Sequence, residues 1–420
     1  MKLLLTLDKK LRSNLLILFA AGLLFWCSMA SFLPTLPLYV DHIGGTKQEV
    51  GIVMGSFAIG LLSFRTRLGR FSDRKGRKIV LLIGTLVVTI APLLYVGTNS
   101  IYGLIAIRAF HGISIAAFST AYTALVADLA PEENRGEIIG YMSLVSSLGV
   151  AIGPAVGSYL VETAGYPQLF LFASGLGFFS ILFSTQITNS PINSSVQKNN
   201  RSKFWQLFAN PKVRVPAIIL LLVGLNFGSM RTFVPLFIKS TDAGLNPGLF
   251  YTASAIAGFS VRLLVGRAAD RYGRGLFVSI SLVLYVIALV NIWSASSSQS
   301  FLISGAIEGA GLGMLIPMIS AIIADRALPE ERGRMFGFCL TGFDLGIAIA
   351  GPVLGTVAEE IGYRNIFAFS AALSFLAFVI FITQSSKDIS HSLRFAFGRG
   401  QDLYALNQID RNFTTKHSQS

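Results

Sequence analysis

The chain has 420 residues, of which 53% are apolar or aromatic and only 13% are charged, about half the charged fraction of a typical soluble domain. This composition, with a mean hydropathy of +0.64, excludes an ordinary water-soluble protein. The net charge of +13 would suit a nucleic-acid partner only if the basic residues shared one soluble face, and they do not. Cys27 and Cys339 lie in apolar runs, so we expect no disulfide framework and no metal site.

Apolar stretches follow one another along almost the whole chain, and each has about the length that a membrane-spanning helix needs. None shows the strict alternation of a half-buried strand, so the sequence predicts an all-α membrane protein. The first stretch is too long for a secretory signal and is expected to be retained. The stretches are residues 14–38, 48–66, 79–97, 101–126, 137–160, 168–187, 214–238, 248–265, 276–293, 300–324, 334–357 and 365–383.

Lysine and arginine are distributed unequally between the two sides of these predicted spans. With both termini inside, 29 of the 34 basic residues fall on the inner side, and only Lys47, Lys239 and Arg364 fall on the outer side. Since positive residues in short loops stay in the cytoplasm, this count predicts an even number of spans with both termini cytoplasmic. We expect a multi-pass protein of the plasma (inner) membrane.

The chain divides at its longest inner connection, which is rich in Ser, Asn and Lys. We expect an N-terminal six-helix bundle over residues 1–187, a cytoplasmic linker over 188–213 and a C-terminal six-helix bundle over 214–383. Residues 384–420 are polar and mixed in charge, so we expect a cytoplasmic, mostly disordered tail.

The two halves repeat each other at an offset of 197 residues. The loop after the second stretch and the loop after the eighth share a glycine, acidic and basic pattern, and Ala127-Asp128 recurs as Ala324-Asp325. Such duplication is a known construction of transporters, with the substrate site near the midplane between the halves. The loop residues are Gly69, Asp73, Arg74, Gly76, Arg77 and Lys78 in the first half and Gly266, Asp270, Arg271, Gly273 and Arg274 in the second.

The fifth stretch carries a second pattern of small residues. Gly149, Gly153 and Gly157 recur every four residues and form one stripe where another helix can approach closely. Gly140 precedes them, and Pro154 removes a backbone donor and is expected to bend the helix.

With the loop pattern G-x-x-x-D-R-x-G-R-K and the glycine pattern of the fifth stretch, residues 14–383 resemble the major facilitator superfamily. The fifth stretch, Pro34-Thr-Leu-Pro37 and Arg108 with Gly112 resemble its twelve-helix drug/proton antiporters; His111 departs from the Gln usual before that glycine. The resemblance implies two pseudo-symmetric bundles of six helices. It also implies that Asp73 latches the start of the eleventh helix in the outward-facing state.

Charged residues inside membrane spans are costly and are functional candidates by default. Four stand out, namely Arg108, Arg231, Glu308 and Asp344. Arg108, His111 and Tyr122 share one mostly polar face of the fourth predicted helix, which we expect to look into a central cavity. Glu308 lies 197 positions after His111, so the repeat places a carboxyl and an imidazole at matching depth, where either can exchange a proton.

Apolar and aromatic side chains share faces of the first and seventh predicted helices. These faces predict an apolar cavity wall suited to amphipathic compounds, although a lipid-facing surface is the common alternative. The candidates are Phe25, Met29 and Phe32 on the first helix and Asn226 and Phe233 on the seventh.

The function that these features favour is secondary active transport of a small amphipathic molecule by alternating access, coupled to protons and directed outward. The alternatives are uptake or facilitated transport of a sugar or organic acid and, from another class, a polytopic membrane enzyme or receptor. The absence of HExxH, GxSxG and Walker motifs argues against an enzyme and against ATP as the energy source. We expect a monomer in the lipid bilayer with a small-molecule substrate, with protons as the coupling ion, and without cofactors or nucleic acid.

Overall fold

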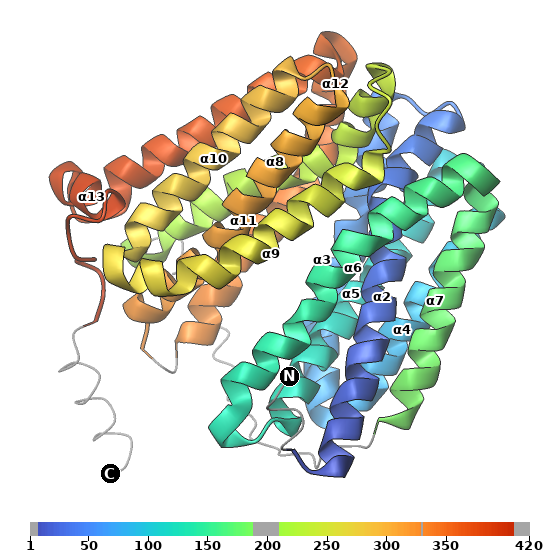
Figure 1. The fold of residues 1–420 in the computed structure, drawn as a ribbon, viewed down its shortest axis with the longest axis horizontal. Helices are drawn as coiled ribbons and strands as arrows, with labels where there is room; N and C mark the ends of the chain where they lie inside the picture. Colours follow the sequence, from blue (N-terminus) through green and yellow to red (C-terminus); the bar gives the residue numbers. More distant parts are fainter. Residues whose placement is uncertain (1–6, 188–209, 329–330, 407–420) are drawn as a thin grey trace. The chain divides into compact units, whose positions relative to one another are not determined.

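The computed structural model describes residues 7–187, 210–328 and 331–406, and these ranges are almost entirely helical (Figure 1). Each predicted apolar stretch overlaps a helix, but α3 and α9 continue nine and seven residues beyond the stretches 48–66 and 248–265, and the last two stretches lie in one element, α12. The α-helices are α2 (Lys9–His42), α3 (Lys47–Lys75), α4 (Arg77–Val96), α5 (Ile101–Leu129), α6 (Arg135–Ala164), α7 (Tyr166–Gln186), α8 (Pro211–Ser240), α9 (Pro247–Tyr272), α10 (Arg274–Ser294), α11 (Ser298–Arg326), α12 (Arg332–Gln384) and α13 (Ile389–Ala396), with one 3-10 turn, η1 (Glu132–Asn134).

Local sequence signals set several helix starts. The Asp8 side chain accepts hydrogen bonds from the backbone N–H groups of Lys10 and Leu11 at the start of α2. Thr46 and Glu49 form a capping box at the start of α3, which satisfies backbone donors that the first turn leaves unpaired.

Glycine breaks occur at equivalent positions of the two halves. Gly165 has φ +97° and separates α6 from α7, and Gly362, 197 residues later, has φ +78° and interrupts the 53-residue α12. A side chain is strained at such angles, so glycine is the residue that permits these sharp turns. Each of the two glycines is followed by a tyrosine, Tyr166 or Tyr363. The repeat thus extends to a turn that the sequence analysis did not identify.

Eleven helices of the described chain are long and apolar enough to cross a membrane. Large apolar side chains are also exposed along them, for example Leu93, Phe179, Ile287 and Phe375. An exposed surface of this kind is stable when lipid rather than water surrounds it.

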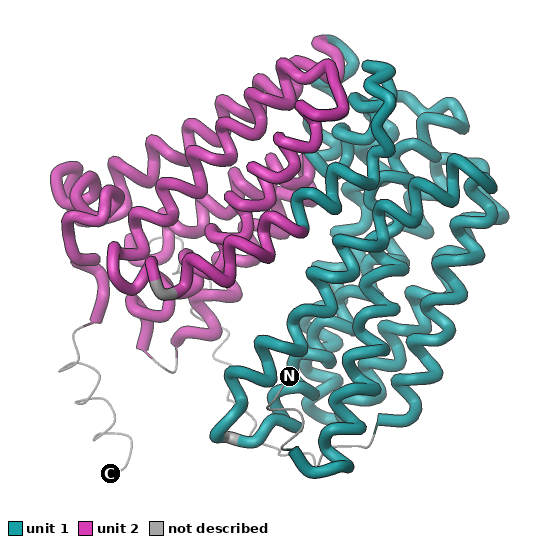
Figure 2. Tube along the Cα trace, viewed as in Figure 1, with its two compact units in different colours: residues 1–198, 230–255, 351–360 teal, residues 199–229, 256–350, 361–420 magenta. Residues whose placement is uncertain are grey.

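The helices form two compact units (Figure 2). Unit 1 comprises Met1–Lys198, Met230–Ala255 and Gly351–Glu360, so it contains six helices of the first repeat and shorter segments of the second. Within it α3 packs on α5, α2 packs on α6, and α4 packs on α7. Buried serines join helices, since Ser28 Oγ donates to the carbonyl of Ala173 at 2.8 Å.

Unit 2 comprises Asn199–Ser229, Ile256–Ala350 and Ile361–Ser420. Within it α10 packs on α11, and Asn226 Nδ2 donates to Ser374 Oγ at 2.7 Å in the buried interior. The expected linker falls mostly on residues 188–209, which lie outside the described ranges.

The expectation of a mostly disordered tail is corrected for residues 389–406. Residues 389–396 form α13, and Asp402 pairs with Arg326 of α11. The partner lies 76 residues away in the sequence, so the local composition of the tail did not reveal the contact. Residues 407–420 lie outside the described ranges.

Candidate functional site

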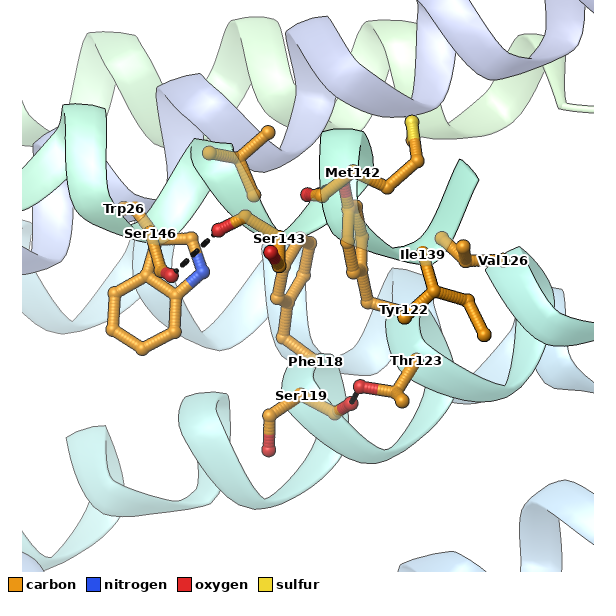
Figure 3. A pocket seen from close by; sticks show the side chains of 11 residues that line it. Trp26, Phe118, Ser119, Tyr122, Thr123, Val126, Ile139, Met142, Ser143 and Ser146 are labelled. Carbon is orange, nitrogen blue, oxygen red and sulfur yellow. Dashed lines mark hydrogen bonds between the residues drawn. The ribbon is translucent and has the colours of Figure 1, made fainter. Parts of the chain in front are cut away.

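A pocket opens within unit 1 among α2, α5 and α6 (Figure 3). Its cavity volume is about 150 Å³, which is smaller than the roughly 300 Å³ at which pockets for drug-sized ligands begin. Of the residues proposed from the sequence, Tyr122 lines it. No charged side chain is among the lining residues, which are Trp26, Phe118, Ser119, Tyr122, Thr123, Val126, Ile139, Met142, Ser143, Val145 and Ser146.

Stacked aromatic rings form one wall of the pocket and continue into the core behind it. The rings of Phe118 and Tyr122 lie 5.2 Å apart at an interplanar angle of 24°, and Phe25 stacks on Phe118 at 3.8 Å. Trp26 meets Phe25 edge to face at 5.8 Å. The wall therefore offers flat, apolar surface to a ligand.

The hydroxyl groups of the pocket all donate their hydrogens to backbone carbonyl groups. Tyr122 Oη donates to Met142 at 3.0 Å, and four serine and threonine hydroxyls donate within their own helices. These four are Ser119 to Ile115 at 2.7 Å, Thr123 to Ser119 at 2.9 Å, Ser143 to Gly140 at 2.7 Å and Ser146 to Ser143 at 3.0 Å.

The polar face proposed for the fourth span divides between two environments. Ser119 and Tyr122 line the pocket, whereas Arg108 is 6% exposed and His111 is fully buried. The Arg108 guanidinium lies 4.4 Å from the Phe57 ring centroid, and Nε and one terminal nitrogen of Arg108 have no hydrogen-bond partner among the described residues. Arg108 is thus a buried cation held largely by an aromatic face.

His111 lies in an aromatic shell beside Arg108. Tyr95 Oη is 3.4 Å from His111 Nδ1, and the Phe32 ring meets the imidazole edge to face at 5.4 Å. His111 Nε2 has no partner among the described residues. One imidazole nitrogen is therefore left without a hydrogen bond inside unit 1.

Glu308 occupies the equivalent position in unit 2. It is 2% exposed, and Tyr285 Oη donates to its Oε1 at 3.1 Å. In both halves a tyrosine from the preceding helix faces the titratable group, Tyr95 toward His111 and Tyr285 toward Glu308.

The other two charged candidates have different surroundings. The Arg231 guanidinium lies 4.7 Å from the ring centroid of Tyr251 in unit 1. Asp344 is half-buried on α12 in unit 2.

The apolar candidates of the first helix do not line this pocket. Phe25 and Phe32 are fully buried and Met29 is 6% exposed, so they pack inside unit 1, whereas the neighbouring Trp26 lines the pocket. Asn226 and Phe233 are also fully buried. The signal missed was Trp26, whose amphipathic ring borders the polar side of the same helix.

The repeated loop motifs form equivalent ion-pair clusters. Arg77 pairs with Asp73 and, at 3.4 Å, with Asp128, while Lys78 Nζ donates to the Thr185 carbonyl at 2.6 Å. The second half has the equivalent pairs, since Arg274 contacts Asp325 and lies 4.0 Å from Asp270. Gly76 and Gly273 have φ of +103° and +90° at the turns between the paired helices. Arg74, Gly69, Gly266 and Arg271 belong to the same segments.

Three glycines of the fifth span pack directly on α2. A Cβ atom at Gly149 would overlap Trp26, and one at Gly153 or Gly157 would lie 2.7 Å from the carbonyl oxygen of Cys27 or Ser31. Gly140 has nothing within 4 Å of such an atom, so it is not part of this contact. Pro154 is buried within α6.

The end of unit 1 near the C-terminus of α2 joins segments from both sequence repeats. Lys239 Nζ lies 3.3 Å from Asp41 Oδ2, and Asn246 Nδ2 donates to Glu162 at 3.0 Å. The Thr252 hydroxyl donates to the Ala151 carbonyl at 2.6 Å.

The backbones of α3 and α12 also meet at this end. A Cβ at Gly51 would overlap the carbonyl group of Gly351, and the reverse also holds. We call this set of contacts the closed end of unit 1. The pocket lies away from it, because its lining residues come from the middle of α2, the second half of α5 and the first half of α6.

The fold and the pocket define a polytopic helical membrane protein of the transporter class. The family model of the Major Facilitator Superfamily matches residues 18–274 and 247–400, so the chain belongs to this superfamily, whose members are transporters and not enzymes.

Similar proteins include exporters. The staphylopine export protein of Staphylococcus aureus is 27% identical over 83% of this chain and 90% of its own length. The multi-drug resistance efflux pump PmrA of Streptococcus pneumoniae is 26% identical over 85% of this chain and 92% of its own. Among solved structures, the nucleoside transporter NupG has a TM-score of 0.75 at 17% identity, covering 88% of this chain and 98% of its own.

Proposed function

We propose that this protein exports a small amphipathic molecule in exchange for protons, by alternating access. The observation that carries the proposal is the asymmetry of unit 1. At its closed end, segments of the first and second sequence repeats are in contact, and away from that end the unit has an open pocket. A carrier that exposes its site to one side at a time needs this arrangement.

The direction of the opening follows from the basic residues. If both termini are cytoplasmic, as the charge distribution predicts, the closed end faces outward and the pocket opens to the cytoplasm. We propose twelve spans in two six-helix halves, because Gly362 divides α12 as Gly165 divides α6 from α7. An exporter collects its substrate in this inward-open state.

The pocket supports an amphipathic substrate. Its stacked rings offer apolar contact, its hydroxyl oxygens offer polar contact, and it has no carboxylate or cation to require a fixed ligand charge. The similarity to drug efflux proteins agrees with such a substrate.

Glu308 is the proposed proton carrier. It is a buried carboxyl that accepts a hydrogen bond from Tyr285 Oη, and a carboxyl can bind and release a proton. His111, at the equivalent position of unit 1, is the second candidate, and Arg108 is the neighbouring fixed charge.

The test is proton flux in inverted membrane vesicles carrying a preformed proton gradient. Lipophilic cations, neutral drugs, sugars and organic acids are added in turn, with Glu308→Gln vesicles as the matched control. We expect amphipathic compounds to release protons from wild-type vesicles only. Proton release by sugars or organic acids alone, or equal release from the Glu308→Gln vesicles, would contradict the proposal.

A further inference from the structure

Helix α13 is a short amphipathic helix that follows the last membrane-spanning segment by four residues. Its inward side is fixed on unit 2. Ser392 and Ala396 are fully buried and Phe395 is 6% exposed. Ser279 Oγ of α10 donates to the carbonyl of Ala396 at 2.9 Å, so α13 has a defined position on α10.

Two further features hold this segment in place. Gly275 of α10 leaves room for the carbonyl of Phe395, which any Cβ atom there would overlap. Beyond α13, Arg326 Nε donates to Asp402 at 2.7 Å and a terminal nitrogen donates to the same carboxylate at 3.1 Å, with the Arg326 side chain 1% exposed. Leu129 stands at the equivalent position of the first half, so this anchor is specific to unit 2.

An adjacent face of α13 and the residue that follows it expose an apolar stripe. Ile389, Leu393 and Phe397 are spaced four residues apart and are 61%, 37% and 49% exposed. Residues at this spacing lie on the same face of a helix. Three large apolar side chains exposed on so short a segment are unfavourable in water but favourable in lipid.

The stripe continues the lipid-facing surface of unit 2. Exposed Ile280, Val283 and Ile287 follow α10 away from the turn on which α13 packs. The Phe395 ring lies 6.0 Å from that of Phe381, near the end of α12, at an interplanar angle of 55°. Since α13 lies at the end of two membrane-spanning helices, it lies at the depth of the lipid headgroups.

Exposed cations flank the stripe. Lys387, Arg394 and Arg399 are all exposed. The nearby acid, Asp388, caps the helix, and the backbone N–H of His391 holds the pKa of its carboxyl below the usual value. Basic side chains next to an apolar stripe complement an anionic phospholipid surface.

We propose that residues 387–399 bind anionic phospholipid at the membrane surface. Ile389, Leu393 and Phe397 enter the outer part of the acyl-chain region, while Lys387, Arg394 and Arg399 contact the phosphate groups. The docked inner side then ties unit 2 to the headgroup layer. This proposal concerns a lipid contact and does not depend on the transported substrate.

The first experiment measures insertion in the full-length protein. Leu393→Cys and His391→Cys, each in a Cys27→Ser and Cys339→Ala background, are labelled with an environment-sensitive fluorophore and placed in nanodiscs that contain doxyl-labelled lipid. Position 391 is exposed on the side of α13 away from the stripe, about 160° around the helix from position 393, and is the matched control. We expect blue-shifted emission and strong quenching at 393 only. Equal quenching by lipid at both positions overturns the proposal. Quenching at position 393 by a quencher attached to a second copy of the protein, without quenching by lipid, also overturns it, because the stripe would then contact protein.

The second experiment tests the lipid charge. Nanodiscs of phosphatidylcholine are compared with discs in which phosphatidylglycerol replaces part of it, using the label at position 393 with and without Lys387→Gln, Arg394→Gln and Arg399→Gln. Each basic residue near an anionic surface changes partitioning about fivefold. We expect the anionic lipid to increase quenching in the parent and not in the triple variant. An equal increase in both overturns the headgroup assignment.

Discussion

Tyr285 Oη donates a hydrogen bond to Glu308 Oε1 at 3.1 Å inside unit 2, and Tyr95 Oη stands 3.4 Å from His111 Nδ1 inside unit 1. The two tyrosines come from the helices that precede the titratable residues in each repeat. His111 and Glu308 are equivalent in the repeat, but the two tyrosines are not, since Ile292 stands at the position equivalent to Tyr95 and Val88 at the one equivalent to Tyr285. Each half therefore places a tyrosine beside its titratable group from a different turn of the preceding helix. Only the carboxyl can carry a negative charge when it releases its proton.

Substitution of Glu308 separates coupling from transport. We expect Glu308→Gln to abolish uphill export while downhill exchange continues, because the amide cannot release a proton. Glu308→Asp should retain part of the coupling. Tyr285→Phe removes a hydrogen bond to an ionisable group, worth about 1.5–3 kcal/mol when that group is charged, and should displace the pH profile of export. Substrate uptake into inverted vesicles, measured between about pH 5.5 and 8.5, tests the three variants. If Glu308→Gln still concentrates the substrate as well as the wild type, Glu308 is not the proton carrier, and Asp344 or His111 takes its place as the candidate.

We expect Arg108 to be required for transport and to lower the thermal stability of the folded protein. A buried cation with unpaired nitrogens is costly, so Arg108→Met should leave the thermal unfolding midpoint of the detergent-solubilised protein equal to or above that of the wild type. The same change should abolish transport. A midpoint lowered by several degrees, or wild-type transport, would show that Arg108 is a structural residue instead.

Asp73→Asn should impair transport strongly while expression stays nearly normal. The Asp73 side chain is 65% exposed, and an exposed ion pair contributes only about 0–1 kcal/mol to stability, so the fold does not depend on its bond to Arg77. Asp270→Asn is the matched comparison and should be milder, because Gly275 follows Arg274 where the first half has Lys78. The measurement is the transport rate divided by the amount of protein, which a quantitative blot gives. Equal activity of Asp73→Asn and wild type would refute a conformational role.

Gly351→Ala should loosen the closed end of unit 1. The added Cβ would overlap the carbonyl of Gly51, so α3 and α12 must separate, whereas Gly337→Ala on the same helix has nothing within 4 Å and is the control. A thiol placed by Thr252→Cys in a Cys27→Ser and Cys339→Ala background reports on opening. We expect an impermeant thiol reagent to label it faster in Gly351→Ala than in Gly337→Ala; equal rates would mean that this glycine contact does not hold the end closed.

The helices and their repeat could be predicted from the sequence because hydropathy reports directly on burial in lipid. The pairing of Arg77 with Asp128 also follows from the repeated motif. Gly165 and Gly362 also lie 197 residues apart, so the repeat relates the two turns. They have no Asp or Arg residues at a repeated spacing like those of the loop motifs, and a single glycine is a weak signal by itself.

Side-chain direction within a helix was harder to predict. The pocket uses Trp26 rather than Phe25, and these neighbours differ by only one helical step, about 100°. The docking of α13 depends on Arg326 and Asp402, whose contact is set by tertiary packing and has no local pattern.

The hydroxyl hydrogens in the pocket of unit 1 have a consequence for molecular selection. Because each of the five hydroxyls already gives its hydrogen to a backbone carbonyl, what it turns toward a guest is oxygen lone pairs. These oxygens can accept hydrogen bonds from N–H or O–H groups of a bound molecule, and the indole N–H of Trp26 can donate one. The hydrogen-bonding groups of the pocket therefore favour a molecule that carries donors beside its apolar surface.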